Sequence, residues 1–279
     1  MIRTSRQLKA LVRNLSKGDS TKALIIIRNY VMERFLERLS ISQYRDNLIL
    51  KGGILVAAMV GLDNRSTLDV DATVKNLPLT EVSARNFVED ITGIEIDDGM
   101  TFEILNVAVI MDEADYPGIR VLLDTRLETM RTPLKIDFST GDVITPSEVS
   151  YSFKLLFEDR SISLLAYNLE TVLSEKIETL IARGTANSRM RDFYDIFALV
   201  QSQSHNIDRT VLKTAFSNTS EKRRSATVVD NMDLILDEVE SSLEMMALWT
   251  NYQRKFEYAA DIGWSEVMQV VRTLCARLR

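Results

Sequence analysis

Two neighbouring segments decide the expected fold: Leu48-Ile49-Leu50-Lys51-Gly52-Gly53 and Arg65-Ser66-Thr67-Leu68-Asp69-Val70-Asp71. An apolar run that ends in two glycines predicts a strand leading into a turn tight enough to bring backbone N–H groups against a phosphate. Residues 54–60 then predict a short apolar helix. The alternation that follows predicts a second strand with Asp69 and Asp71 on one face. Carboxylates this close repel each other, and such pairs usually share a divalent cation.

A third carboxylate fits the same arrangement. Residues 133–139 alternate as a strand, with Asp137 on the polar face. Together with Asp69 and Asp71 it could hold Mg²⁺ or Mn²⁺ ions, which stabilise the attacking and leaving oxygens of a phosphoryl displacement. Aspartates on the solvated face of a sheet are also ordinary surface residues. The glycine pair upstream favours the metal-binding interpretation.

Composition excludes several classes of protein. The chain has 279 residues, of which 46% are hydrophobic and 27% charged, as in ordinary globular proteins. We expect a cytoplasmic protein that does not insert into a membrane, because no apolar run is long enough to cross a bilayer and no signal peptide is evident. Cys275, the single cysteine, excludes an internal disulfide and a cysteine-based zinc cluster. His205, the single histidine, lies in a polar stretch and argues against a Ser-His-Asp triad.

The pattern along the chain predicts an α+β protein made of two parts. In residues 1–150, helical periodicity over 20–40 and 80–91 accompanies strand-like segments at 47–50, 68–74, 101–110, 119–127 and 133–139. Residues 151–279 are expected to form an all-helical domain that completes the active-site cleft, with residues 153–166 as a transition. No heptad repeat is evident, so we expect a monomer.

The helical part contains a second group of charged residues. Lys176 falls on the apolar face of a helix predicted over 168–183. The next predicted helix, over 189–200, places Asp192 on its apolar face, with Asp195 at the edge and Arg189 one turn earlier. Ionic groups that point inward are costly unless they meet a partner or a polar cleft. They could line an active-site cleft, or Lys176 could form a buried structural pair with Asp192 or Asp195.

Positive charge is concentrated at the N-terminus. The net charge is −6, but residues 1–32 hold seven cations and one acid, so this segment carries +6 and the remainder −12. Five of the cations recur at helical spacing and form one stripe: Arg3, Arg6, Lys9, Arg13 and Lys17. The stripe could dock on a phosphate backbone, or it could be the solvated face of a helix that packs on the core.

Read in order, these motifs resemble the AbiEii nucleotidyltransferase toxins. The resemblance covers roughly residues 47–200 and rests on Lys-Gly-Gly from Lys51, Arg-x-Thr-x-Asp-Val-Asp from Arg65, Lys-Ile-Asp-Phe from Lys135, Ser-Glu-Lys ending at Lys176, and Arg-x-Arg-Asp-Phe-Tyr-Asp-Ile from Arg189. The first motif has Gly53 where the better-known version has serine. One hydroxyl contact to the phosphates is therefore expected to be missing.

The resemblance implies a DNA polymerase β-like nucleotidyltransferase core followed by a helical domain. It also implies a toxin of bacterial toxin–antitoxin and phage abortive-infection systems, hence a role in antiviral defence and an AbiEi-type antitoxin as partner. Related Men-type toxins add nucleotides to the acceptor end of tRNA. By resemblance, the catalytic residues are Asp69, Asp71, Lys176 and Asp192, and the nucleotide-binding residues are Lys51, Gly52, Gly53, Arg65, Thr67, Lys176 and Arg189.

The reaction expected is attack of an acceptor hydroxyl on the α-phosphate of a nucleoside triphosphate, with Asp137 assisting as a metal ligand or by positioning that hydroxyl. Nothing in the sequence selects the nucleotide. Two alternatives remain open at this level. One is an enzyme that modifies a small molecule or a protein hydroxyl, and the other is a catalytically silent nucleotide-binding module. The basic stripe favours a nucleic-acid acceptor.

Overall fold

The protein is described by a computed structural model that covers residues 1–110 and 117–278, apart from the side chains of residues 228 and 229. The chain forms two compact units that interleave along the sequence. Unit 1 comprises Met1–Ala58, Ser66–Gly141 and Val149–Ala166, and unit 2 comprises Met59–Arg65, Asp142–Glu148 and Tyr167–Arg279. The predicted domains were instead contiguous, with the second beginning at residue 151.

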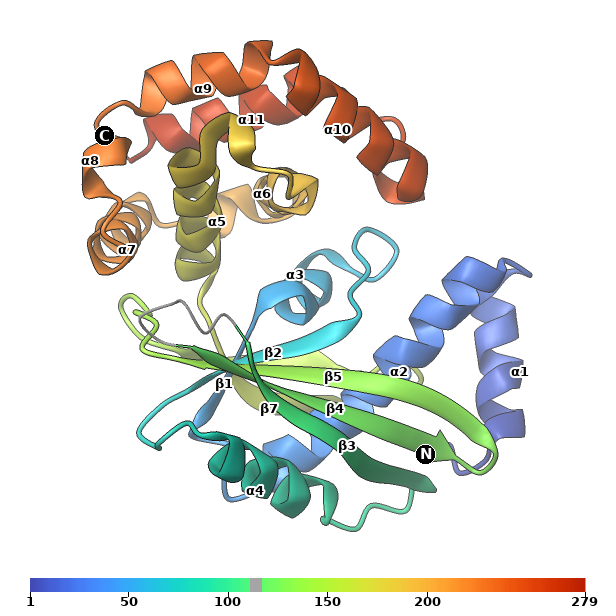
Figure 1. The fold of residues 1–279 in the computed structure, drawn as a ribbon. Helices are drawn as coiled ribbons and strands as arrows, with labels where there is room; N and C mark the ends of the chain where they lie inside the picture. Colours follow the sequence, from blue (N-terminus) through green and yellow to red (C-terminus); the bar gives the residue numbers. More distant parts are fainter. Residues whose placement is uncertain (111–116, 279) are drawn as a thin grey trace. The chain divides into compact units, whose positions relative to one another are not determined.

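Unit 1 is built on a mixed sheet (Figure 1). Within the described residues its seven strands follow the order β3-β4-β5-β2-β1-β7-β6. Their bounds are β1 Leu48–Lys51, β2 Asp69–Val74, β3 Met100–Ile110, β4 Gly118–Leu127, β5 Met130–Thr140, β6 Val149–Lys154 and β7 Ser161–Ala166. β1 pairs antiparallel with β2, which pairs in parallel with β5. Polar side chains on these central strands are therefore brought side by side.

Five of the seven strands match the predicted segments closely, whereas β6 and β7 were missed. These two strands are short and rich in serine, a residue that gives little preference for a strand. Their antiparallel pairing places Ser150 opposite Leu165 and Ser152 opposite Ser163. Long-range pairing, rather than local preference, therefore makes them strands.

Four helices begin in unit 1: α1 Ser5–Ser16, α2 Ser20–Ile41, α3 Gly52–Val60 and α4 Glu81–Thr92. Side-chain caps start three of them, with Thr4 before α1, Asp19 before α2 and Thr80 before α4. In Figure 1, α2 and α4 lie on one face of the sheet and α3 lies on the other. α3 begins directly where β1 ends, so the turn between them lies at the end of a central strand of the sheet.

The core of unit 1 contains buried charge as well as apolar side chains. Most of α2 is buried, including Glu33, Arg34 and Arg38. Arg38 donates to both oxygens of Asp98, at 2.7 and 2.9 Å. The backbone N–H of Leu156 donates to the Glu33 carboxylate, at 3.0 and 3.1 Å. Arg38 and Glu33 therefore each have a hydrogen-bond partner, as the burial of a polar group in a core requires.

Unit 2 is helical from Leu169 onward, as predicted, within the part that the structure describes. Its helices are α5 Leu169–Arg183, α6 Met190–Gln203, α7 Arg209–Lys222, α8 Ala226–Val229, α9 Met232–Ser241, α10 Leu243–Lys255 and α11 Trp264–Ala276. Aromatic side chains fill much of its core, where the ring of Trp249 lies 6.0 Å from Trp264 and 5.4 Å from Tyr252. Across the described residues, no helix is both long and apolar enough to cross a membrane.

Candidate active site

The turn between β1 and α3 lies against the carboxylate of Asp71. Lys51 ends β1 and pairs with Asp71 on β2. Gly52 adopts a φ of +66°, a conformation that favours glycine, and a Cβ atom there would collide with the Asp71 carboxylate. The N–H of Gly53 donates to Oδ2 of Asp71 at 3.4 Å. The glycine pair therefore forms a tight turn with a carboxylate directly against it.

Adjacent strands bring three carboxylates to one face of the sheet. Asp71 on β2 is in register with Asp137 on β5, and Asp69 is in register with Lys135. Because register partners and residues two apart share a face, Asp69, Asp71 and Asp137 point the same way. The Nζ atom of Lys135 lies 3.7 Å from Oδ2 of Asp69. Thr67 is fully buried, and its hydroxyl donates to Oδ1 of Asp69 at 3.2 Å.

The electrostatics of this face favour a cation. Burial, together with the nearby carboxylates of Asp69 and Asp137, raises the pKa of Asp71 to about 6. Lys51 and the N–H of Gly53 act in the opposite direction. A half-buried, crowded set of carboxylate oxygens matches the hard oxygen ligands that Mg²⁺ and Mn²⁺ prefer. The residues at this face therefore fit a divalent cation.

Arg120 is a site residue that the sequence analysis missed. It donates through Nε to Oδ1 of Asp137 at 2.8 Å and through Nη2 to Oδ2 at 2.6 Å. This hydrogen bonding raises the pKa of Arg120. Both oxygens of Asp137 are thus engaged, and no group of three or more His, Cys, Asp or Glu side chains is arranged to hold a metal in residues 1–110 and 117–278. The role of Asp137 as a third ligand stays a prediction.

Unit 2 holds the second group of predicted residues as one ionic network. Lys176 on α5 donates to Oδ2 of Asp195 at 2.6 Å and to Oδ1 of Asp192 at 3.0 Å, both on α6. Arg65 donates to the two oxygens of Asp195, at 2.6 and 3.2 Å. Nε of Arg189 lies 3.2 Å from Oδ2 of Asp192. The structural pair foreseen for Lys176 is therefore present with both acids.

Opposite charges dominate this network despite its burial. Burial alone would lower the pKa of Lys176, but Asp195 and Asp192 raise it above the ordinary value. Burial alone would raise the pKa of Asp195, but Lys176 and Arg65 lower it. Lys176 therefore stays positive and Asp195 negative near neutral pH. Oδ2 of Asp192 is buried and makes no hydrogen bond within the described residues, but it lies 3.2 Å from Nε of Arg189, so its charge is paired.

Two residues assigned to nucleotide binding are buried. Arg65 is 1% exposed and bound to Asp195, and Thr67 is 0% exposed and bound to Asp69. Their contacts shown here are with protein carboxylates, and direct contact with a nucleotide remains a prediction. The side chain of Arg189 is 58% exposed and can reach a ligand.

Comparison with known proteins places this arrangement in a family. A family model described as nucleotidyl transferase AbiEii toxin, type IV TA system, matches residues 34–270. No curated protein matches the chain. Among solved structures, MenT4, a nucleotidyltransferase toxin from Mycobacterium tuberculosis, is 16% identical with a TM-score of 0.58, and the comparison covers 97% of this chain and 99% of that one.

JHP933 from Helicobacter pylori is 14% identical with a TM-score of 0.50, over 91% of this chain and 93% of that one. At these identities the two structures support the fold, which is the predicted α+β nucleotidyltransferase architecture with a helical C-terminal region. The family model, which spans most of the chain, confirms the resemblance seen in the motifs. The chain belongs to the AbiEii nucleotidyltransferase toxins of type IV toxin–antitoxin systems.

Proposed function

We propose that the protein transfers a nucleotide from a nucleoside triphosphate to an RNA acceptor, specifically tRNA, and that this transfer makes it toxic. The observation that carries the proposal is the register of Asp71 with Asp137, beside a glycine turn that contacts Asp71. The hydroxyl oxygen of the acceptor forms a bond to the α-phosphorus and its proton passes to water, while the bond from the α-phosphorus to the bridging oxygen breaks and pyrophosphate leaves.

We assign the acceptor side of the reaction to the carboxylate face. Asp69 and Asp71 would hold a divalent cation, which neutralises developing charge on the phosphates when bound. Thr67 and Lys135 fix the Asp69 carboxylate from two directions. Asp137, whose carboxylate is oriented by Arg120, positions the attacking hydroxyl through a hydrogen bond.

We assign phosphate binding to the turn and to unit 2. α3 begins at Gly52, and the positive end of its helix dipole favours an anion at this turn. Lys176 and Arg189 supply positive charge to the triphosphate and the departing pyrophosphate. Asp192 orients both cations, Lys176 through the 3.0 Å contact to Oδ1 and Arg189 through the 3.2 Å ion pair to Oδ2.

The test is incubation of the purified protein with a divalent cation, each α-labelled nucleoside triphosphate in turn, and total cellular RNA. We expect label from one nucleotide in a tRNA-sized band. Asp69→Asn and Asp71→Asn should lose this transfer and the inhibition of growth on expression. The matched control is Asp46→Asn, because Asp46 is 73% exposed and lies outside the carboxylate face.

The other functions give different results in the same assay. Label found in protein or in a small molecule, and not in RNA, would show that the enzyme uses one of these as its acceptor. Growth inhibition that survives both substitutions would indicate a module that acts by binding. We propose that the toxin acts in the cytoplasm. Co-expression of an AbiEi-type antitoxin should therefore restore growth of the cells.

A further inference from the structure

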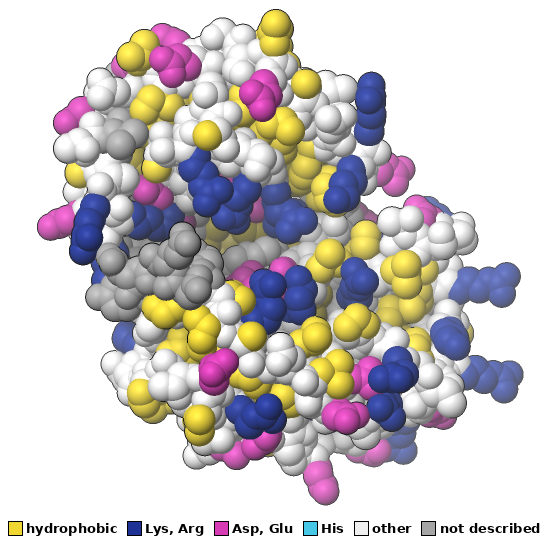
Figure 2. Space-filling view, in the orientation of Figure 1, with side chains coloured by type: hydrophobic (Ala, Val, Ile, Leu, Met, Phe, Trp, Pro, Cys, Tyr) yellow, Lys and Arg dark blue, Asp and Glu magenta, His cyan; other side chains and the backbone are white. Residues whose placement is uncertain are grey.

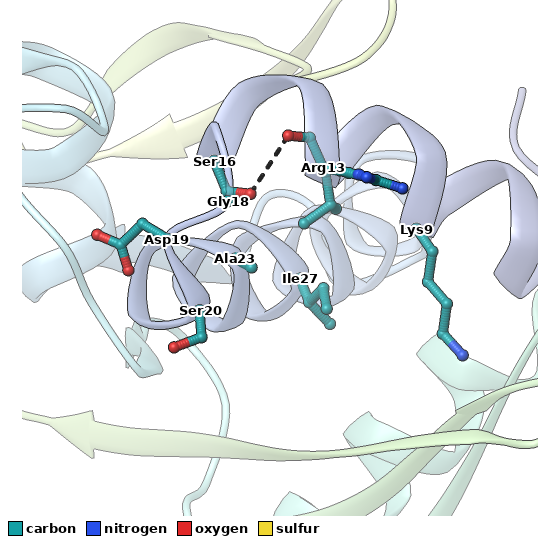
Figure 3. A pocket seen from close by; sticks show the side chains of 9 residues that line it. Lys9, Arg13, Ser16, Gly18, Asp19, Ser20, Ala23 and Ile27 are labelled. Carbon is teal, nitrogen blue, oxygen red and sulfur yellow. Dashed lines mark hydrogen bonds between the residues drawn. The ribbon is translucent and has the colours of Figure 1, made fainter.

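The two N-terminal helices enclose a small groove with a basic rim. The groove has a volume of about 230 Å³ and runs between α1 and α2. Ala23 and Ile27 reach it from α2, while Lys9 and Arg13 reach it from α1 (Figure 3). Its apolar floor is completed by Val12, a buried residue of α1. The groove thus combines an apolar floor with two flexible cations.

The basic stripe predicted from the sequence lies on the exposed side of α1. Arg6, Lys9, Arg13 and Lys17 are all exposed, and in the described residues none of these four makes an ion pair. Arg3, the fifth member, pairs with Asp97. Figure 2 shows Lys and Arg side chains projecting into solvent at the edge of unit 1 where α1 lies in Figure 1.

The acid nearest the groove does not cancel this charge. Asp19 is the only acid among residues 1–32, and its carboxylate caps α2 by accepting from the N–H groups of Thr21 and Lys22, at 2.7 and 3.1 Å. A carboxylate at a helix N-terminus is stabilised by the helix dipole and directed toward the backbone. A second acid, Glu128, accepts hydrogen bonds from Ser5 and lies close enough to Lys9 to interact with it electrostatically. The four exposed cations of α1 outnumber these two acids, so its surface remains positive on a chain whose net charge is −6.

The α1 helix fixes the backbone positions of these cations along one line. Thr4 and Gln7 form a capping box at the start of α1, and Lys17 ends the helix in the left-handed conformation. With a rise of about 1.5 Å per residue, the stripe from Arg6 to Lys17 extends roughly 16 Å. A line of that length on one rigid helix can contact several successive phosphates without first being ordered.

We propose that α1 and the rim of the α1–α2 groove form the docking surface for the RNA substrate, with Lys9 and Arg13 binding backbone phosphates. The inference rests on the proposed function for the identity of the polyanion. An RNA strand is favoured over an acidic protein because the cations lie in a regular line, which suits a repeating charge.

The experiment compares two double variants that remove the same charge. Lys9→Gln/Arg13→Gln removes the rim of the groove. Arg45→Gln/Arg85→Gln removes two exposed cations of unit 1 away from it, one in the loop after the far end of α2 and one on α4. Binding of bulk tRNA is measured by filter binding over a range of salt concentrations, with thermal unfolding and nucleotide binding measured on the same preparations.

The logarithm of the affinity falls as the logarithm of the salt concentration rises. We expect this fall to be less steep in the Lys9/Arg13 variant, with the slope smaller in magnitude by about 1.4 to 1.8, since each phosphate contact contributes about 0.7 to 0.9. At 0.1 M salt this corresponds to a loss of affinity of roughly 25- to 60-fold. The Arg45/Arg85 variant should keep the wild-type slope. Both variants should retain nucleotide binding and the wild-type unfolding temperature.

If the wild-type protein labels tRNA but the Lys9/Arg13 variant keeps the wild-type salt slope, the proposed docking surface is wrong and the proposed function is unaffected. If the Lys9/Arg13 variant has a less steep salt slope but the wild-type protein labels no RNA, the docking surface is supported and the proposed function is refuted. Loss of neutralisation by the antitoxin together with a wild-type tRNA slope would assign the surface to a protein partner and overturn the inference.

Discussion

The ammonium nitrogen of Lys176 lies 2.6 Å from Oδ2 of Asp195, a carboxylate with no exposed surface. The same carboxylate also accepts from Arg65, which is 130 residues away in the sequence. One buried acid therefore holds two cations in place. Asp192 also contacts Lys176, but its second cation is Arg189, whose side chain is 58% exposed, whereas Arg65 is buried. The two acids of α6 therefore differ in how much buried charge they support.

Asp195→Asn should be much more destabilising than Asp192→Asn. Removing the charge of Asp195 leaves Arg65 and Lys176 buried with weakened partners, which costs about 3–5 kcal/mol. After Asp192→Asn, Lys176 still has Asp195, so the loss should be less than half as large. Urea denaturation of the two variants measures both values. Equal losses would contradict a special role for Asp195.

Gly52→Ala should damage both stability and nucleotide transfer. The positive φ costs about 1–2 kcal/mol for alanine, and the new methyl group displaces the Asp71 carboxylate. A misplacement of about 1 Å costs roughly 100-fold in rate. The control is Gly61→Ala, because Gly61 also has a positive φ but its Cβ would lie 3.7 Å from Asn64. Equal transfer by the two variants would show that the Asp71 contact does not matter.

Asp71→Asn should abolish transfer yet stabilise the metal-free protein at pH 8. The folded-state pKa of about 6 lies above the ordinary 3.8, so ionisation of Asp71 costs stability progressively as the pH rises from 3.8 to about 6, and the full cost is present at pH 8. The shift sets an upper limit of about 3 kcal/mol on the gain. Urea denaturation in a chelator at pH 8 measures it, with Asp46→Asn as the exposed control. A destabilised variant would contradict the crowding of carboxylates described here.

Glu33 should make stability fall as the pH rises from about 4.5 to 8. Burial raises its folded-state pKa to about 8, so across this interval the folded state binds more protons than the unfolded state. Its contribution is complete below the unfolded pKa and is lost as the pH approaches 8. Glu33→Gln should flatten the dependence by up to about 1.4 kcal/mol per pH unit. Denaturant titrations at pH 5 and pH 8 compare the two proteins, and parallel profiles would refute this role.

The sequence by itself determined the features that depend on neighbouring residues. Alternation along β2 put Asp69 and Asp71 on one face, and the glycine pair after an apolar run predicted the turn before α3. Helical spacing placed Lys176 and Asp192 inward, and both are largely buried. These features follow from backbone periodicity and from the freedom of glycine, which act over a few residues.

Only the tertiary structure decided which distant side chains meet. Leu127 pairs with Met130 across a two-residue turn, and that register sets Arg120 opposite Asp137. Folding also buries Arg65 against Asp195, a contact across 130 residues that no local pattern predicts. Pairing also made strands of the serine-rich β6 and β7. Such contacts depend on register and packing between segments far apart in the chain, which local preference does not encode.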